Sequence, residues 1–92
     1  MSVSIQIPTA LRSFTAGASR VDVDALTAGE ALTALTTTHP ALSNQLRGPD
    51  GTLRSFVNVY LNDEDIRFLQ KDATPLVEGD TLIIVPSIAG GR

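Results

Sequence analysis

The sequence predicts an α+β fold in which one main helix packs across a mixed sheet. Two short alternating segments open the chain, a single helical segment follows, and further strand-like segments close it. This order of elements is typical of a sheet with helices on one face. The 92 residues fit a single domain, and 42% hydrophobic with 18% charged residues is the composition of an ordinary globular protein.

The first two strands are predicted from alternating apolar and polar residues. Residues 3–7 place valine or isoleucine at every second position, which is the period of a strand with one buried face. Residues 21–24 repeat this pattern with aspartates after the valines. The two segments therefore form a predicted hairpin, and Leu11 and Phe14 are expected to anchor the loop between them.

The main helix is predicted to begin at Thr27. Thr27 and Glu30 match a capping box, in which the threonine hydroxyl accepts from the Glu30 amide and the Glu30 carboxylate reaches back to the Thr27 amide. Pro40 ends the helical pattern, so His39 is expected at the C-terminal cap rather than in a catalytic role. The apolar stripe that should face the sheet consists of Ala28, Ala31, Leu32 and Leu35.

The second half of the chain supplies the remaining strands. A further helical turn is predicted at residues 42–46 and a turn at residues 48–51. Residues 56–61 form the clearest strand, with its aliphatic side chains toward the helix, and residues 66–68 are predicted to be a short edge strand. Residues 81–85 form an uncharged, β-branched run that suits a buried central strand.

This order predicts a β-grasp roll over residues 1–86, with the last strand in the centre beside the first. Residues 87–92 are expected to form a flexible C-terminal Gly-Gly tail that extends clear of the domain. Such a segment reaches on the order of 20 Å when it is extended.

Composition argues against two classes of partner. A net charge of −3, with only seven lysines and arginines, argues against nucleic-acid binding. No stretch approaches the roughly 20 apolar residues of a membrane span, and the N-terminus lacks the features of a signal peptide. We therefore expect a cytoplasmic protein that binds neither nucleic acid nor membrane.

Independent catalysis and metal binding are not expected either. The chain has no cysteine, one histidine and no G-x-S-x-G motif, so a nucleophile has little to pair with. The acidic residues 63–65 lack the spacing and the terminal glutamate of a calcium-binding loop, and they fit a charged turn instead. The domain is thus expected to be a carrier rather than an enzyme, with no metal or cofactor of its own.

The end of the chain points to a different chemistry. Ala89, Gly90 and Gly91 follow a long apolar strand, and glycines without side chains can enter a narrow channel that excludes larger residues. Ala89 and Gly90 would give access to a reacting carboxylate on Gly91. Because a carboxylate is a poor electrophile, it must first be activated, usually as an acyl-adenylate. A partner enzyme must then supply the ATP chemistry.

Three stretches carry a resemblance to a known family: Asn62, the Pro-Leu-Val-Glu-Gly-Asp-Thr-Leu segment at residues 75–82, and the Pro-Ser-Ile-Ala-Gly-Gly ending at residues 86–91. With them the chain resembles, over essentially its whole length, the ubiquitin-like sulfur carriers. That family includes the small subunit of molybdopterin synthase and the carriers of thiamin and cysteine biosynthesis. From residue 56 to residue 68 the chain is most similar to the cysteine-biosynthesis carrier.

The resemblance implies a cycle of activation and sulfur transfer. An E1-like activating enzyme adenylates the carboxylate of Gly91, which is then converted to a thiocarboxylate. In the cysteine branch, a PLP-dependent cysteine synthase presents an activated serine as the acceptor, and a JAMM-type metalloprotease later frees cysteine from the tail. The resemblance thus implies three partner enzymes.

Arg92 departs from this pattern, because active carriers end at the second glycine. With Arg92 present, Gly91 is in a peptide bond and has no carboxylate to adenylate. Our hypothesis is that Arg92 is a one-residue extension that a protease removes. The alternative is that it was added in cloning.

A docking surface is expected on the sheet face away from the helix. If Leu82 and Ile84 face the helix, Ile83 and Val85 point the other way, where Tyr60 and Phe56 are expected to join them. An exposed apolar patch of this kind marks a partner interface. The alternative is that these side chains lie under the long loops.

Three further functions stay open from the sequence. The sulfur could serve molybdopterin or thiamin instead of cysteine. The chain could be a ubiquitin-like modifier conjugated to proteins through Gly91, or a non-covalent interaction module that does not need Gly90 and Gly91.

Overall fold

The computed structural model describes residues 2–86 and places five strands in one mixed sheet. The strands are β1 (Ser2–Gln6), β2 (Arg20–Asp24), β3 (Val57–Leu61), β4 (Glu64–Asp65) and β5 (Thr81–Pro86), in the spatial order β2-β1-β5-β3-β4. The central strand β5 runs parallel to β1 and antiparallel to β3. The predicted mixed sheet, with its last strand beside the first, is confirmed.

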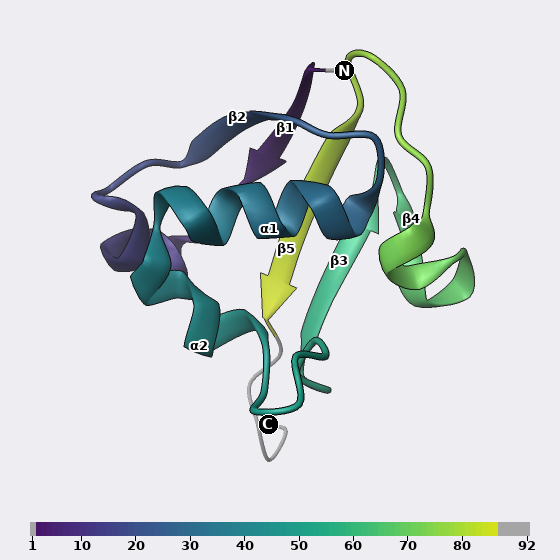
Figure 1. The fold of residues 1–92 in the computed structure, drawn as a ribbon. Coiled ribbons are helices and arrows are strands. Elements are labelled where there is room, and N and C mark those ends of the chain that lie inside the picture. The colour runs from purple at the N-terminus through teal and green to yellow at the C-terminus, as the bar shows by residue number, and fades with distance from the viewer. Residues whose placement is uncertain (1, 87–92) are drawn as a thin grey trace.

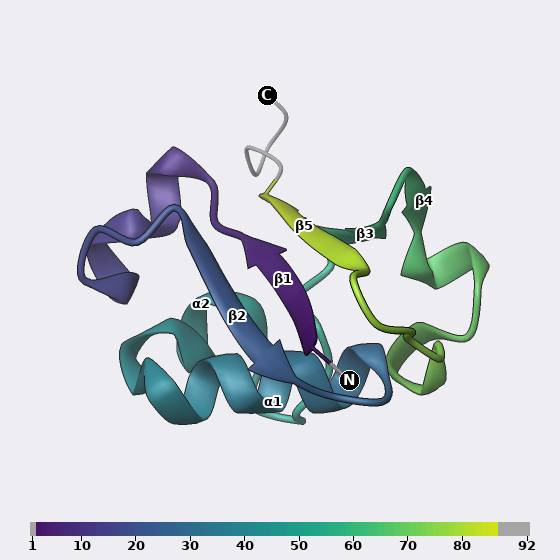
Figure 2. The ribbon, with the colours of Figure 1, turned by 90° about the horizontal axis from the view of Figure 1, so that it is seen from above.

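One face of this sheet is covered by helices. The main helix α1 (Ala28–Thr38) crosses the sheet (Figure 1), and the short α2 (Ser43–Leu46) lies on the same side (Figure 2). Four 3-10 segments complete the described elements: η1 (Thr9–Thr15), η2 (Pro40–Leu42), η3 (Ile66–Phe68) and η4 (Lys71–Ala73). Neither α1 nor α2 reaches the opposite face, which we call the open face.

The hydrophobic core lies between the sheet and α1. Alternate strand residues and the apolar stripe of α1 are buried: Val3, Ile5, Val57, Val59, Leu82, Ile84, Ala28, Ala31, Leu32 and Leu35. Complete burial of one such leucine contributes about 2 kcal/mol. Leu11 is also buried and Phe14 packs against the core, so both predicted anchors are confirmed, although their segment forms η1 rather than an irregular loop.

The start of α1 differs from a full capping box. Thr27 Oγ1 accepts from the Glu30 amide at 3.2 Å as predicted, but the Glu30 carboxylate accepts from the Leu26 amide at 3.0 Å rather than from Thr27. Hydrogen bonds of the Ala28 amide to Thr74 O and of the Leu76 amide to Leu26 O, both 2.9 Å, hold the approach to the helix. This pairing fixes Leu26 where its amide meets the carboxylate.

The prediction of an edge strand at residues 66–68 is wrong. The edge strand β4 contains only Glu64 and Asp65, and residues 66–68 form η3. The Asp65 carboxylate accepts from the Arg67 amide at 2.9 Å, and this local bond replaces a continued ladder with a capped turn. As a result Ile66 is 1% exposed in the core while Phe68 is 84% exposed.

The end of α1 and the predicted turn at residues 48–51 are confirmed, whereas the charged turn predicted at residues 63–65 is shorter, because Glu64 and Asp65 form β4. His39 occupies the C-terminal cap, where its amide donates to Leu35 O at 2.9 Å. The Gly51 amide closes a turn on Gly48 O at 3.0 Å, and Gly51 and Gly79 have φ of +83° and +88°. Glycine suits these two turns because L side chains rarely adopt such angles.

Candidate docking face and tail root

Strand β5 alternates between the core and the open face. Leu82 and Ile84 are buried under α1, whereas Ile83 is half-buried and Val85 is 40% exposed. Successive side chains of a strand point to opposite faces, so Ile83 and Val85 belong to the open face. The central strand thus carries apolar side chains toward a face that α1 and α2 leave uncovered.

The register brings predicted residues of two strands together. Tyr60 of β3 lies opposite Ile83, and Asn58 lies opposite Val85. Directly opposed side chains of an antiparallel pair have Cβ atoms roughly 5 Å apart. We call Tyr60, Ile83 and Val85 the open-face patch. Tyr60 and Ile83 are half-buried without belonging to the core cluster.

Phe56, the fourth predicted docking residue, lies in the turn immediately before β3 and is 37% exposed. It is not part of the ladder, because the first residue of β3 in register is Val57, opposite Pro86. Strand alternation therefore does not place its side chain. Membership of Phe56 in the open-face patch stays a prediction.

A hydrogen-bonded group of Ser4, Arg20 and Asp22 borders the open face on the side of β2. Ser4 Oγ donates to Asp22 Oδ1 at 3.0 Å, and Arg20 donates through Nε at 2.9 Å and Nη2 at 3.2 Å to the two oxygens of the same carboxylate. These bonds, first from Arg20 and then from Ser4, hold the pKa of Asp22 below its usual range. The bond to Asp22 likewise raises the pKa of Arg20.

A hollow of about 430 Å³ lies beside the end of β5. Its lining comes from the ends of β1 and β5 and from the start of η1, namely Gln6, Ile7, Pro8, Thr9, Arg12 and residues 83–86. Arg12 is held there because its Nε donates to Ile7 O at 3.1 Å. This hollow marks the root of the C-terminal tail, since Pro86 is the last described residue.

The sequence missed Arg12, Gln6 and Asn58 at this surface. Gln6 is the register partner of Ile83 on the β1 side, as Asn58 is of Val85 on the β3 side. Strand alternation already placed both polar residues on the open face, so that signal was available. Arg12 carried no such signal, because its position depends on the turn of η1.

The predicted reacting residues lie outside the described residues. Ala89, Gly90, Gly91 and Arg92 all follow Pro86. Within residues 2–86, no group of three or more histidine, cysteine, aspartate or glutamate side chains is arranged to hold a metal ion. None of the described helices is long and apolar enough to span a bilayer.

Known proteins match between about three quarters and nearly all of this chain. Residues 5–91 match the ThiS family. The chain is 40% identical to Sulfur carrier protein CysO of Mycobacterium tuberculosis, covering 99% of this chain and all of that protein. It is 41% identical to Small archaeal modifier protein 1 of Haloferax volcanii, covering 78% of this chain and 79% of that protein.

A solved structure shows the same fold at similar identity. In the crystal structure of the Amycolatopsis orientalis BexX/CysO complex, a chain superposes with a TM-score of 0.87 at 37% identity, covering 97% of this chain and 99% of that one. The resemblance to ubiquitin-like sulfur carriers, which was based on Asn62, residues 75–82 and residues 86–91, is confirmed. This chain belongs to the ThiS family.

Proposed function

We propose that this chain is a sulfur carrier whose Gly91 carboxylate, exposed by removal of Arg92, becomes a thiocarboxylate that donates sulfide. We favour cysteine as the product. The observation that carries the proposal is the 40% identity with Sulfur carrier protein CysO across 99% of this chain. The match with the ThiS family extends to Gly91 itself, which is the proposed reacting residue.

The chemistry assigned to the tail runs in two steps. A Gly91 carboxylate oxygen attacks the α-phosphorus of ATP, which forms the acyl-adenylate and releases pyrophosphate. A hydrosulfide ion supplied by a sulfur donor then attacks the carbonyl carbon and displaces AMP, and loss of its proton leaves a thiocarboxylate on Gly91. The chain contributes the carboxylate and a narrow approach through Ala89 and Gly90, while an E1-like enzyme contributes ATP and the sulfur transfer.

The domain gives these enzymes a surface to recognise. Ile83 and Val85 of the open-face patch lie on β5, the strand that leads into the tail, so a partner that covers the patch lies next to the tail root. The BexX/CysO complex supports such a partner, because there a similar chain assembles with another protein. We assign docking to Ile83, Val85, Tyr60 and Phe56.

After activation, we assign sulfur acceptance to a PLP-dependent cysteine synthase and processing to a JAMM-type metalloprotease. The thioester first formed with cysteine rearranges to an amide when the cysteine amine attacks its carbonyl and releases the thiol. The same protease class would remove Arg92, because both reactions then cut a peptide bond immediately after Gly91. The encoded chain is then an inactive precursor. Arg92 blocks adenylation until it is removed.

The second candidate is a protein modifier conjugated through Gly91. The 41% identity with Small archaeal modifier protein 1 favours this alternative. It shares the adenylation step but uses a lysine amine as the acceptor, so the product is an amide branch on another protein. The two functions therefore diverge only after the adenylate.

Recovery of the chain from its own cells separates these functions. An affinity-tagged chain is purified under denaturing conditions and studied by intact mass and by peptide mapping. Sulfur carriage predicts free chain ending at Gly91 with one carboxylate oxygen replaced by sulfur, together with its cysteine adduct. Branched peptides carrying the tail on lysines, without any thiocarboxylate, would favour the modifier and refute sulfur carriage.

A further inference from the structure

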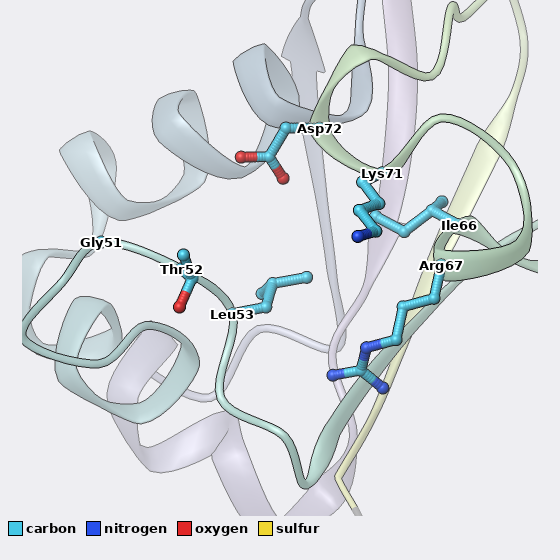
Figure 3. A pocket seen from close by; sticks show the side chains of 7 residues that line it. All are labelled: Gly51, Thr52, Leu53, Ile66, Arg67, Lys71 and Asp72. Atoms are coloured by element: carbon cyan, nitrogen blue, oxygen red, sulfur yellow. The ribbon is translucent and has the colours of Figure 1, made fainter.

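A second cavity lies at the sheet edge, apart from the tail root. It has a volume of about 610 Å³ and is lined by Gly51, Thr52, Leu53, Ile66, Arg67, Lys71 and Asp72. The loop before β3 forms one wall, and η3 and η4 form the other (Figure 3). We call it the edge groove. Nothing in the proposed sulfur chemistry uses it.

The two walls of the edge groove are tied together by Arg47. One of its terminal nitrogens, Nη1, donates to Gly51 O at 2.9 Å and to Asp72 Oδ2 at 3.2 Å, so one guanidinium joins both sides. The ion pair also compensates the charge of Asp72, the acidic residue of the lining. A direct contact therefore joins the two walls, and the remaining charged residues of the lining, Arg67 and Lys71, are positive.

Arg67 supplies the first of these charges. Its guanidinium donates to Asn58 Oδ1 at 2.5 Å, to Val57 O at 2.7 Å and to Arg54 O at 2.9 Å, all of which are uncharged acceptors. Within residues 2–86, no carboxylate lies within ion-pair distance of it. A partly buried cation bound only to neutral groups retains its attraction for an anion.

Lys71 supplies the second charge. Its backbone has a φ of +53°, in the left-handed region that non-glycine residues rarely adopt. Hydrogen bonds from the Gln70 amide to Thr74 Oγ1 and from the Thr74 amide to Lys71 O, both 3.0 Å, hold this turn closed. In Figure 3 the Lys71 side chain projects into the groove from the same side as Arg67. This backbone conformation of Lys71 is strained, and it accompanies a side chain that points into the groove.

We infer that the edge groove binds a short acidic segment of a partner protein, with an apolar side chain against Leu53 and Ile66 and carboxylates near Arg67 and Lys71. Two cations without described carboxylate partners, in a protein of net charge −3, give the charge complementarity. The apolar residues Leu53 and Ile66 in the lining favour a peptide over a free inorganic anion.

The groove is also continuous with the open face. The guanidinium of Arg67 binds Asn58, which is the register partner of Val85 in the open-face patch. A partner that covers the patch can thus extend around the sheet edge into the groove. The inference that a partner protein fills the groove thus rests in part on the proposed function, because that function requires a docking partner. The binding test uses the isolated chain and needs no sulfur chemistry.

The test is a titration of the isotope-labelled chain by NMR. The probe is a short synthetic peptide with one leucine flanked by aspartates and glutamates, and the matched probe carries asparagine and glutamine instead. We expect saturable shifts at Leu53, Ile66 and Lys71, with the neutral peptide at least about tenfold weaker. Equal binding of both peptides, or no saturable shift, would overturn the inference.

Variants locate the binding to the groove. Lys71→Gln should lower the affinity for the acidic peptide severalfold. Arg20→Gln, which removes one positive charge from β2 instead, should leave that affinity unchanged. Lys71→Gly should weaken binding as much and keep or raise the unfolding midpoint, because glycine tolerates the φ of +53°. Unchanged binding by both Lys71 variants would contradict the inference.

Inorganic phosphate is the third ligand to be titrated. Shifts at the same residues with phosphate alone, at an affinity equal to that of the peptide, would show a small-anion site and refute the peptide occupant. If the acidic peptide binds but the chain never carries sulfur, the inference about the edge groove is supported and the proposed function is refuted. If sulfur transfer proceeds and no peptide binds, the proposed function is supported and the inference about the edge groove is refuted.

Discussion

Tyr60 of β3 and Ile83 of β5 lie directly opposite each other on the sheet face away from α1. The next pair in the same ladder, Leu61 and Leu82, faces the core, where Leu82 is completely buried. Tyr60 and Ile83 are half-buried and stand outside the core cluster. They offer apolar area that a partner can cover without any rearrangement of the domain.

Ile83→Asp, made in the chain that ends at Gly91, is expected to abolish adenylation by the activating enzyme. A carboxylate in the centre of the covered patch would be desolvated without a partner, which costs about 3 kcal/mol, or a roughly hundredfold loss in affinity. The domain should keep its circular-dichroism spectrum, because Ile83 points away from the core. Pyrophosphate release by the activating enzyme measures the effect.

The matched control for this variant is Thr33→Asp, which adds the same charge on an exposed position of α1. Made in the chain that ends at Gly91, it should be activated like the same chain without a substitution. If Ile83→Asp were activated equally well, the open-face patch would not be the docking surface.

Neighbouring positions on β5 should separate stability from docking. Leu82→Ala is expected to lower the free energy of unfolding by about 2 to 5 kcal/mol, because it leaves a cavity in the core. Val85→Ala, three residues later and 40% exposed, should cost less than about 1 kcal/mol. Urea unfolding measures both, and similar losses at the two positions would refute the assigned faces.

The strands and the main helix were predictable because their signals are local. Alternation placed Leu82 and Ile84 in the core and left Ile83 and Val85 on the other face, and this holds in the structure. The capping threonine at Thr27 also followed from sequence alone. In these segments the burial pattern and the backbone preference agree.

What the sequence could not predict depends on contacts between distant segments. Glu30 binds Leu26 because residues 74–76 fix the approach to α1. Asp65 caps η3 and ends the edge strand through a side-chain bond that competes with the ladder. The edge groove requires Arg47 to reach Asp72, which lies 25 residues later in the chain.

Gly29→Ala should destabilise the protein although alanine is normally the better helix former. A methyl group on Gly29 would lie 2.9 Å from Asp72 Cβ and 3.0 Å from Asp72 O. The overpacking cost of about 1 to 3 kcal/mol outweighs the gain of about 1 kcal/mol in helix propensity. Urea unfolding should show a net loss, with Thr33→Ala in the same helix as the control that shows none. A gain at Gly29→Ala would mean that α1 and η4 are less closely packed.

Stability should fall at low pH in part through Asp22. Its pKa is lowered in the folded protein by the hydrogen bonds from Arg20 and Ser4, so folding favours the ionised form. This contribution is present above the unfolded value of about 3.9 and is lost as the pH falls through the lowered folded value. Because Arg20 and Asp22 are exposed, the effect should be small and weaken with added salt.

The comparison of urea midpoints from pH 6 to pH 2 for the wild-type chain and Asp22→Asn tests this prediction. The variant should show a shallower acid dependence, because its side chain has no proton to gain. Identical slopes for the two proteins would show that the Asp22 hydrogen bonds contribute nothing to stability.

The central claim is that sulfur is carried on the carboxylate of Gly91. Its most direct test is the intact mass of two chains, one ending at Gly91 and one ending at Arg92, after incubation with the activating enzyme, ATP and a sulfur donor. We predict that the chain ending at Gly91 gains the mass of one oxygen replaced by sulfur, and that the other chain does so only after a JAMM-type protease removes Arg92. Sulfur gained by the chain with Arg92 still attached, or no gain by the chain ending at Gly91, would contradict the account.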